Sequence, residues 1–151
     1  MKRARFAALE LVQQYGLIEP PALAQRLGIA YVEFAFAGRV RGLTAVRSGV
    51  RIIAVNRYLP SSWKRTVAAH ELGHAILHDA LHYYFLVDET FFPTGRYERE
   101  ANEFAAELLI PDVPIDGDEQ HEGMMGYLAD SLDVPTELFR FKTTSSQNES
   151  R

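Results

Sequence analysis

The feature that most constrains this chain is the stretch at residues 66–79, which reads TVAAHELGHAILHD. It is apolar on nearly every side, a pattern that predicts a buried helix. In a helix, His70 and His74 share one face about 6 Å apart along the axis, so their imidazoles can bind one metal ion. Glu71 is rotated about 100° from His70, where it can take a proton from a water molecule beside the ion. The stretch therefore predicts a metal-binding helix that also carries a base.

The alternative is that His70 and His74 are exposed or only hydrogen-bonded, because five-residue His-Glu-x-x-His matches also occur by chance. The apolar surroundings argue against this alternative. Imidazole and carboxylate groups in a buried helix need a polar partner, and a metal ion supplies one.

A third metal ligand is needed, and the same helix does not offer a suitable one. The metzincin pattern places a glycine and a histidine where this chain has Leu77 and Ala80, so that class is excluded. His78 lies about 12 Å along the axis from His70, too far for both to bind one ion. We predict that His78 ends the helix or contacts a ligand. His82 stays an alternative third ligand if the helix breaks before it.

The better source of a ligand is a second predicted helix at residues 97–111, YEREANEFAAELLIP. Glu98, Asn102 and Ala105 share one of its faces. Small residues such as Ala101 and Ala105 allow this helix to pack closely against the first. We therefore predict Glu98 as the third ligand, with Asn102 one turn further on as a hydrogen-bond partner of a ligand.

The remaining glutamates of this helix, Glu100, Glu103 and Glu107, line another face. We interpret that face as solvated, with ordinary exposed helix charges. Glu100 is the one ambiguity, because it directly precedes Ala101 and competes with Glu98 as third ligand. The helical positions favour Glu98, since Glu100 lies about 200° further round and is expected to face solvent.

The two stretches TVAAHELGHAILH and EREANEFAAELLIP together resemble the ImmA/IrrE family of small bacterial and phage metallopeptidases. That family has a His-Glu-x-x-His helix followed by a Glu-x-x-Ala-Asn/Asp-x-Phe-Ala helix that ends in Leu-Leu-x-Pro. The resemblance extends weakly to the N-terminal half and covers about residues 5–138. It implies a zinc endopeptidase in which His70, His74 and Glu98 bind the metal and Glu71 is the general base. Manganese is the alternative metal.

The resemblance also implies a substrate, which the residues themselves do not name. The expected substrate is a helix-turn-helix transcriptional repressor encoded nearby, cut to derepress prophage, mobile-element or stress genes. Two other interpretations stay open. One is a metal-containing binding module that sequesters a repressor or toxin without cutting it, and the other is a purely structural zinc site. The intact Glu71 argues against both, because a closed structural site has no use for a base beside its first ligand.

Bulk properties limit the remaining options. A chain of 151 residues is long enough for one core but too short for a protease domain plus a full DNA-binding domain. A net charge of −4 gives no broad basic field, so direct nucleic-acid binding is not expected. The absence of cysteine excludes disulfides and thiolate metal sites. Polar residues interrupt the N-terminal apolar run, and no stretch reaches about 20 apolar residues. We therefore expect a cytoplasmic protein without a membrane partner.

The predicted fold is α+β, a mostly helical single domain at residues 1–141 with a small three-stranded antiparallel sheet packed against the metal helix. Residues 1–28 form a helical hairpin, residues 29–56 the sheet, residues 61–111 the metal-site helices and residues 118–141 the C-terminal helices. Residues 142–151 are expected to be disordered. Within the sheet, Ser48 and Gly49 form a tight turn between two strands.

Three local expectations complete this description. Ser61 or Ser62 is expected to cap the metal helix at its N-terminus. The aromatic-rich residues 80–94 are interpreted as an irregular loop. The first two helices are interpreted as structural rather than as a DNA-reading helix-turn-helix, because the second one is short and has few basic residues.

Overall fold

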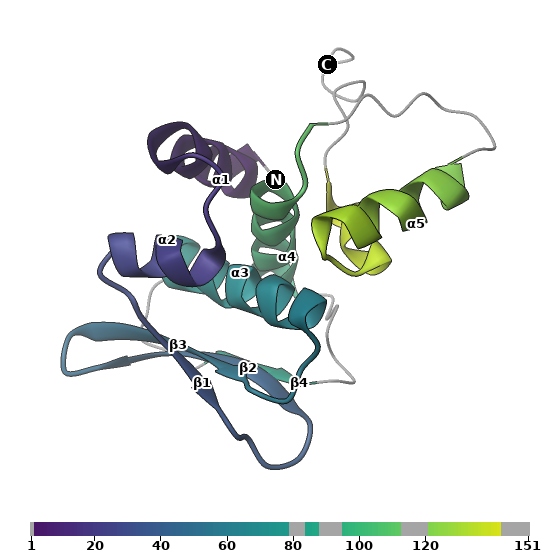
Figure 1. Ribbon diagram of the computed structural model, residues 1–151. Helices are drawn as coiled ribbons and strands as arrows, with labels where there is room; N and C mark the ends of the chain where they lie inside the picture. Colours follow the sequence, from purple (N-terminus) through teal and green to yellow (C-terminus); the bar gives the residue numbers. More distant parts are fainter. Residues whose placement is uncertain (1, 79–83, 88–94, 113–120, 143–151) are drawn as a thin grey trace.

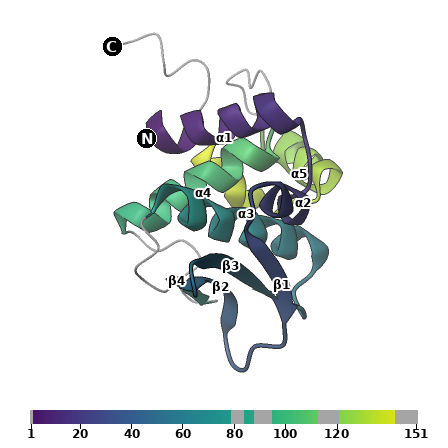
Figure 2. The same cartoon turned by 90° about the vertical axis from the view of Figure 1, so that its left-hand side faces the viewer.

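Helix α3 (Ser61–Leu77), which carries His70 and His74, lies across one face of a β-sheet, and the other helices lie on the same side of that sheet (Figure 1). The structure is a computed structural model that describes residues 2–78, 84–87, 95–112 and 121–142. In the view turned by 90°, α1 and α4 stack above α3, with the sheet at the other end of the stack (Figure 2). Helix α3 is therefore enclosed between the sheet and the remaining helices.

The other helices are α1 (Lys2–Tyr15), α2 (Pro20–Arg26), α4 (Arg96–Leu109), α5 (His121–Leu132) and a 3-10 helix, η2 (Thr136–Phe141). None of the described helices is long and apolar enough to cross a bilayer. The tail was predicted at residues 142–151, but Lys142 is described and donates a hydrogen bond to Glu107, so it is ordered. Residues 143–151 and much of the predicted loop after the metal helix, including His82, lie outside the described residues.

The start of α3 differs from the sequence prediction. Pro60 is the N-cap residue, with an extended backbone, and no side chain caps the helix. Ser61 is already helical, and its hydroxyl donates a hydrogen bond of 2.8 Å to Asp133 instead. The predicted capping role of Ser61 or Ser62 was therefore wrong, because a residue distant in sequence provides the acceptor for the Ser61 hydroxyl.

The sheet has four described strands in the order β1-β3-β2-β4. They are β1 (Ala30–Phe34), β2 (Val40–Arg47), β3 (Val50–Asn56) and β4 (Tyr84–Val87). Strand β1 pairs with β3 in parallel, whereas β2 pairs in the antiparallel direction with both β3 and β4. The α+β class is confirmed. The predicted three-stranded antiparallel sheet is corrected to a mixed sheet with a fourth strand.

The tight turn explains why β1 does not pair with its sequence neighbour β2. Ser48 and Gly49 both have positive φ, 51° and 77°, so the predicted two-residue turn is present and joins β2 directly to β3. Strand β4 occupies the other edge of β2. The free edge of β3 is then the open position for β1. Strand β4 comes from the segment predicted as a loop, and its four residues gave too short a pattern to identify.

Close contacts on two sides hold α3 in place. A Cβ added at Gly42 of β2 would lie 2.6 Å from Cγ1 of Val67 and 3.2 Å from Cγ of Glu71. A Cβ added at Gly73 of α3 would lie 3.2 Å from the Cα of Ala101 on α4. Helix α3 therefore approaches the sheet at a distance that only glycine allows, and it approaches α4 more tightly than most side chains permit. This fixes the positions of the metal-site side chains relative to one another.

We expect the Gly42→Ala substitution to lower the free energy of unfolding by about 1–3 kcal/mol, because the added methyl group must displace Val67 in a packed core. Gly126→Ala is the matched control, since nothing lies within 4 Å of an added Cβ at that position in α5. There alanine should raise the free energy of unfolding by up to about 1 kcal/mol through its helix propensity. Urea denaturation measures the free energy of unfolding of both variants. Equal stability of the two variants would contradict close packing of β2 on α3.

Candidate metal centre

Three side chains from two helices converge at one point. Helix α3 supplies His70 and His74, and α4 supplies Glu98. Within the described part of the chain, one ligand atom from each of these residues lies within 4.8 Å of the others. Nε2 of His70 lies 3.0 Å from Glu98 Oε2, and Nε2 of His74 lies 3.1 Å from Glu98 Oε1. The two Nε2 atoms are 3.1 Å apart.

The chemistry of these donor atoms fits a cation. Asn102 Oδ1, one turn along α4 from Glu98, lies 2.7 Å from His70 Nδ1. An amide oxygen can only accept, so His70 Nδ1 carries a proton and donates it. In neutral His70 the Nε2 atom then presents a lone pair to His74 and Glu98. Electron-rich atoms this close repel one another unless a proton or a metal ion lies between them. The structure thus brings together the residues that the sequence predicted as ligands.

Glu71 lies beside this cluster and is fully buried. The Thr44 hydroxyl of β2 is within hydrogen-bond reach of two Glu71 atoms, the backbone carbonyl oxygen at 2.9 Å and the carboxylate oxygen Oε2. The other carboxylate oxygen, Oε1, is buried and has no hydrogen-bond partner among the described residues. One oxygen is therefore held by the sheet, while the other is left without a partner among the described residues.

Thr44 was missed by the sequence analysis. The signal that could have identified it is strand alternation, because Gly42 and Thr44 are two apart and so point to the same face of β2. That face is the one against α3. A polar residue at an inward position opposite a metal-binding helix needs a polar partner. Its partner is Glu71.

His78 and Glu100 extend the polar contacts away from the cluster. Nδ1 of His74 lies 2.8 Å from Nδ1 of His78, and Nε2 of His78 lies 2.8 Å from Glu100 Oε2. Arg96 Nε donates to the other Glu100 oxygen, Oε1, at 3.1 Å. Glu100 is buried, with 7% of its surface exposed. The prediction that Glu100 faces solvent was therefore wrong.

Glu100 is buried because of the place where α3 ends. The helix stops at Leu77, and His78 has an extended backbone, with φ of −114° and ψ of 140°. A single-helix argument assigned Glu100 to the outside because it considered only the face shared with Glu98. The end of α3 instead covers the neighbouring face of α4, where His78 meets Glu100.

Glu107 is a second correction to the predicted solvated face. It is buried, and its Oε2 accepts a hydrogen bond of 2.8 Å from Lys142 Nζ. Arg5 Nε of α1 lies 4.0 Å from the same oxygen. Helix α1 and the end of η2 cover this part of α4, an arrangement that the periodicity of α4 alone could not reveal.

Burial and mutual contacts shift the pKa values of the cluster in different directions. Burial would lower the pKa of His70, but the hydrogen bond to Glu98 and the charges of Glu71 and Glu98 raise it above its usual value. Burial would raise the pKa of Glu98, but its contacts with His70 and His74 hold it well below the usual range. For His74, burial lowers the pKa to about 4. Burial raises the pKa of Glu71 to about 7, which is suited to a proton acceptor near neutral pH.

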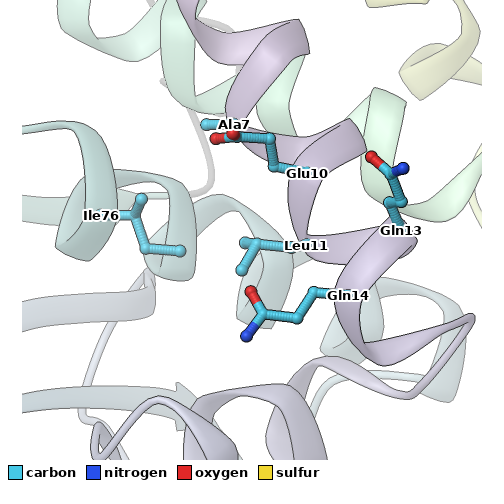
Figure 3. A pocket seen from close by; sticks show the side chains of 6 residues that line it. All are labelled: Ala7, Glu10, Leu11, Gln13, Gln14 and Ile76. Atoms are coloured by element: carbon cyan, nitrogen blue, oxygen red, sulfur yellow. The ribbon is translucent and has the colours of Figure 1, made fainter.

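A separate hollow lies between α1 and the end of α3 (Figure 3). Its lining combines apolar side chains with three polar ones, Glu10, Gln13 and Gln14. It shares no lining residue with the His70, His74 and Glu98 cluster. Of its lining residues only Glu10 has a carboxylate or imidazole group, so the hollow does not gather several metal-ligating side chains as the cluster does. The cluster is therefore the candidate site.

Two comparisons with known proteins agree with this geometry. The family model for peptidase M78, described as the IrrE N-terminal-like domain, matches residues 24–144, a range that includes all the residues of the cluster. An "Uncharacterized immunity region protein 2" from Bacillus phage phi105 is 31% identical over 139 residues, which cover 92% of this chain and 88% of the phage protein. The chain therefore belongs to the peptidase M78 family, the ImmA/IrrE family that its two helical motifs resemble.

Proposed function

We propose that this protein is a zinc-dependent endopeptidase that cleaves a helix-turn-helix transcriptional repressor. Membership of the peptidase M78 family supports a metallopeptidase-type enzyme. The observation that carries the proposal is the buried Glu71 carboxylate, with one oxygen unpartnered among the described residues, beside the convergent donor atoms of His70, His74 and Glu98. A structural metal site would not need such a group.

In this proposal His70, His74 and Glu98 hold the zinc ion, with manganese as the alternative. Bound zinc supplies a Lewis acid that lowers the pKa of water and polarises a peptide carbonyl. Three protein ligands are typical of catalytic zinc sites, which keep one position open. Asn102 orients His70 through the hydrogen bond to Nδ1, so that Nε2 faces the cluster.

Glu71 is the proposed general base. Thr44 holds its Oε2, and Oε1 is positioned to accept a proton from the attacking water molecule. Glu71 then passes this proton to the amine that leaves when the peptide bond breaks. Burial raises the pKa of Glu71, which makes its carboxylate a stronger proton acceptor than that of an exposed glutamate.

The proposed substrate is a repressor encoded near the gene for this protein, and its cleavage would derepress prophage, mobile-element or stress genes. The sequence resemblance implies this substrate, and the phage phi105 relative is named as an immunity region protein. The competing proposal is a metal-containing module that sequesters its partner without cutting it. Incubating the zinc-loaded protein with the regulator encoded next to it separates the two, since only the protease yields a discrete cleavage product.

We expect Glu71→Gln to keep the metal and to lower the cleavage rate by about 10²- to 10⁴-fold, because the amide preserves the shape but cannot accept a proton. Cleavage is followed by gel electrophoresis and mass spectrometry, and bound zinc by elemental analysis. Wild-type cleavage by a zinc-replete Glu71→Gln protein would exclude Glu71 as the base. Tight binding of the regulator by the wild-type protein without any product would favour the sequestering module.

Thr44→Val should lower kcat by about 10- to 100-fold while the zinc affinity stays unchanged, because the valine keeps the volume but removes a hydrogen bond to a charged group. Thr66→Val is the matched control. Thr66 is equally buried on α3, but its hydroxyl donates to the Ser62 carbonyl oxygen, away from the cluster. An unchanged kcat in Thr44→Val would show that Glu71 needs no support from β2.

Glu98→Ala should weaken zinc binding by about 100-fold or more, because it removes one of three ligands, and loss of a residue that only hydrogen-bonds a ligand already costs about 10- to 100-fold. Zinc should also raise the melting temperature of the wild-type protein but not of this variant. Glu103→Ala, which removes the same charge from the same helix, should bind zinc normally. Chelator competition measures the affinities, and zinc retention by Glu98→Ala would mean that another residue is the third ligand.

A further inference from the structure

We propose that Glu100 and His78 act together as positioning residues that determine which ring nitrogen of His74 carries its proton. The proposal rests on the assignment of His74 as a metal ligand through Nε2. Neither residue reaches the three converging donor atoms. They act through His74, along the contacts from Glu100 Oε2 to His78 and from His78 Nδ1 to His74 Nδ1, each 2.8 Å long.

The proton positions follow from the outer end of this chain of contacts. An ionised carboxylate only accepts hydrogen bonds, so Nε2 of His78 must donate to Glu100. A neutral imidazole has one N–H group and one lone pair, so the Nδ1 atom of His78 is an acceptor. The proton in the contact between the two histidines therefore belongs to His74 Nδ1. The Nε2 atom of His74 is left with a lone pair, which faces Glu98 and His70.

This proton arrangement is the one that metal binding requires. A histidine binds a metal through an unprotonated nitrogen, and the partner of its other nitrogen selects the tautomer. For His70 a single amide oxygen, that of Asn102, makes this selection. His74 faces another imidazole, which can accept or donate. Glu100 therefore defines the tautomer of His74 by first defining that of His78.

The surroundings hold this chain of contacts in place and exclude water. His78 keeps its backbone hydrogen bond to the carbonyl oxygen of His74, at 3.1 Å, although the helix has ended. The Tyr97 ring packs on the His78 ring with centroids 4.6 Å apart. His78 is 4% exposed and Glu100 is 7% exposed, so a water molecule cannot readily replace the carboxylate.

The proposal distinguishes a missing acceptor from a missing charge. Glu100→Ala removes the acceptor, so His78 can move its proton to Nδ1 and then oppose the proton of His74. Glu100→Gln keeps an acceptor oxygen for His78 and turns its amide nitrogen towards Arg96. The glutamine therefore loses the hydrogen bond from Arg96. This loss costs little, because the Arg96 side chain is 77% exposed and can be solvated. Glu100→Gln should therefore keep the zinc affinity that Glu100→Ala loses.

The first test measures zinc affinity by chelator competition in the full-length protein. We expect Glu100→Ala to bind zinc about 10- to 100-fold more weakly than wild type, and Glu100→Gln to stay within about threefold of it. Glu103→Ala controls for the loss of a negative charge from α4 and should match wild type. Equal affinities of Glu100→Ala and Glu103→Ala would overturn the proposal, as would an equal loss in the glutamine and alanine variants.

The second test reads the tautomers directly and needs no variant. In the zinc-loaded wild-type protein with ¹⁵N-labelled histidine, long-range ¹H–¹⁵N NMR should find the N–H of His78 at Nε2 and that of His74 at Nδ1. An N–H of His78 at Nδ1 would overturn the proposal even if Glu100→Ala did not fold.

The Glu98→Ala protein separates this proposal from the metal site on which it rests. If Glu98→Ala loses zinc while Glu100→Ala keeps it, the proposed metal site is supported and the positioning role of Glu100 and His78 is excluded. If Glu98→Ala binds zinc as wild type does, the proposed ligand set falls, and the role of Glu100 and His78 falls with it. Repressor cleavage enters neither readout, so a wrong substrate leaves both tests valid.

Discussion

The candidate site of this protein depends on holding four electron-rich atoms together: the Nε2 atoms of His70 and His74 lie 3.1 Å apart, and each lies 3.0–3.1 Å from a different oxygen of Glu98. These atoms repel one another when both histidines are neutral, so the surrounding packing must impose their positions. Two contacts do so. Gly73 lets α3 approach α4, and Gly42 lets the sheet approach α3. The metal-site side chains thus project from rigid elements rather than from loops, which keeps their geometry defined before any ligand binds.

The sheet contributes to the site as well as to the core. Its inward face supports the apolar side of α3, and at Thr44 it also reaches the carboxylate of Glu71. Glu71, the proposed base, therefore has one oxygen hydrogen-bonded to the sheet, whereas His70, a proposed ligand, is hydrogen-bonded to Asn102 of α4. The two residues are neighbours on α3, but different elements orient their side chains.

The parts of the fold that local patterns determine were predicted from the sequence. The buried helix around His70 and His74 follows from an apolar pattern, and the turn at Ser48 and Gly49 follows from backbone preferences. The convergence of Glu98 with the histidines followed from helical faces and small residues. The missed features all depend on elements distant in sequence: the pairing of β1 with β3, the contact of Thr44 with Glu71, and the burial of Glu100 under the end of α3. A helical face that looks acidic can be solvated or covered, and only the neighbouring elements decide which.

The charges around the site explain why these features belong together. Burial raises the pKa of Glu71, and the charge of Glu98 raises it further. Carboxylates without compensation in such a site are costly, so a divalent cation beside both would balance their negative charge. Glu100 adds a third carboxylate nearby, but it contacts His78 and Arg96 instead. Glu98 and the proposed base Glu71 are therefore the carboxylates whose charge a bound metal ion would balance. Folding of α4 against α3 brings them together, so metal affinity and the stability of this helix pair would be coupled.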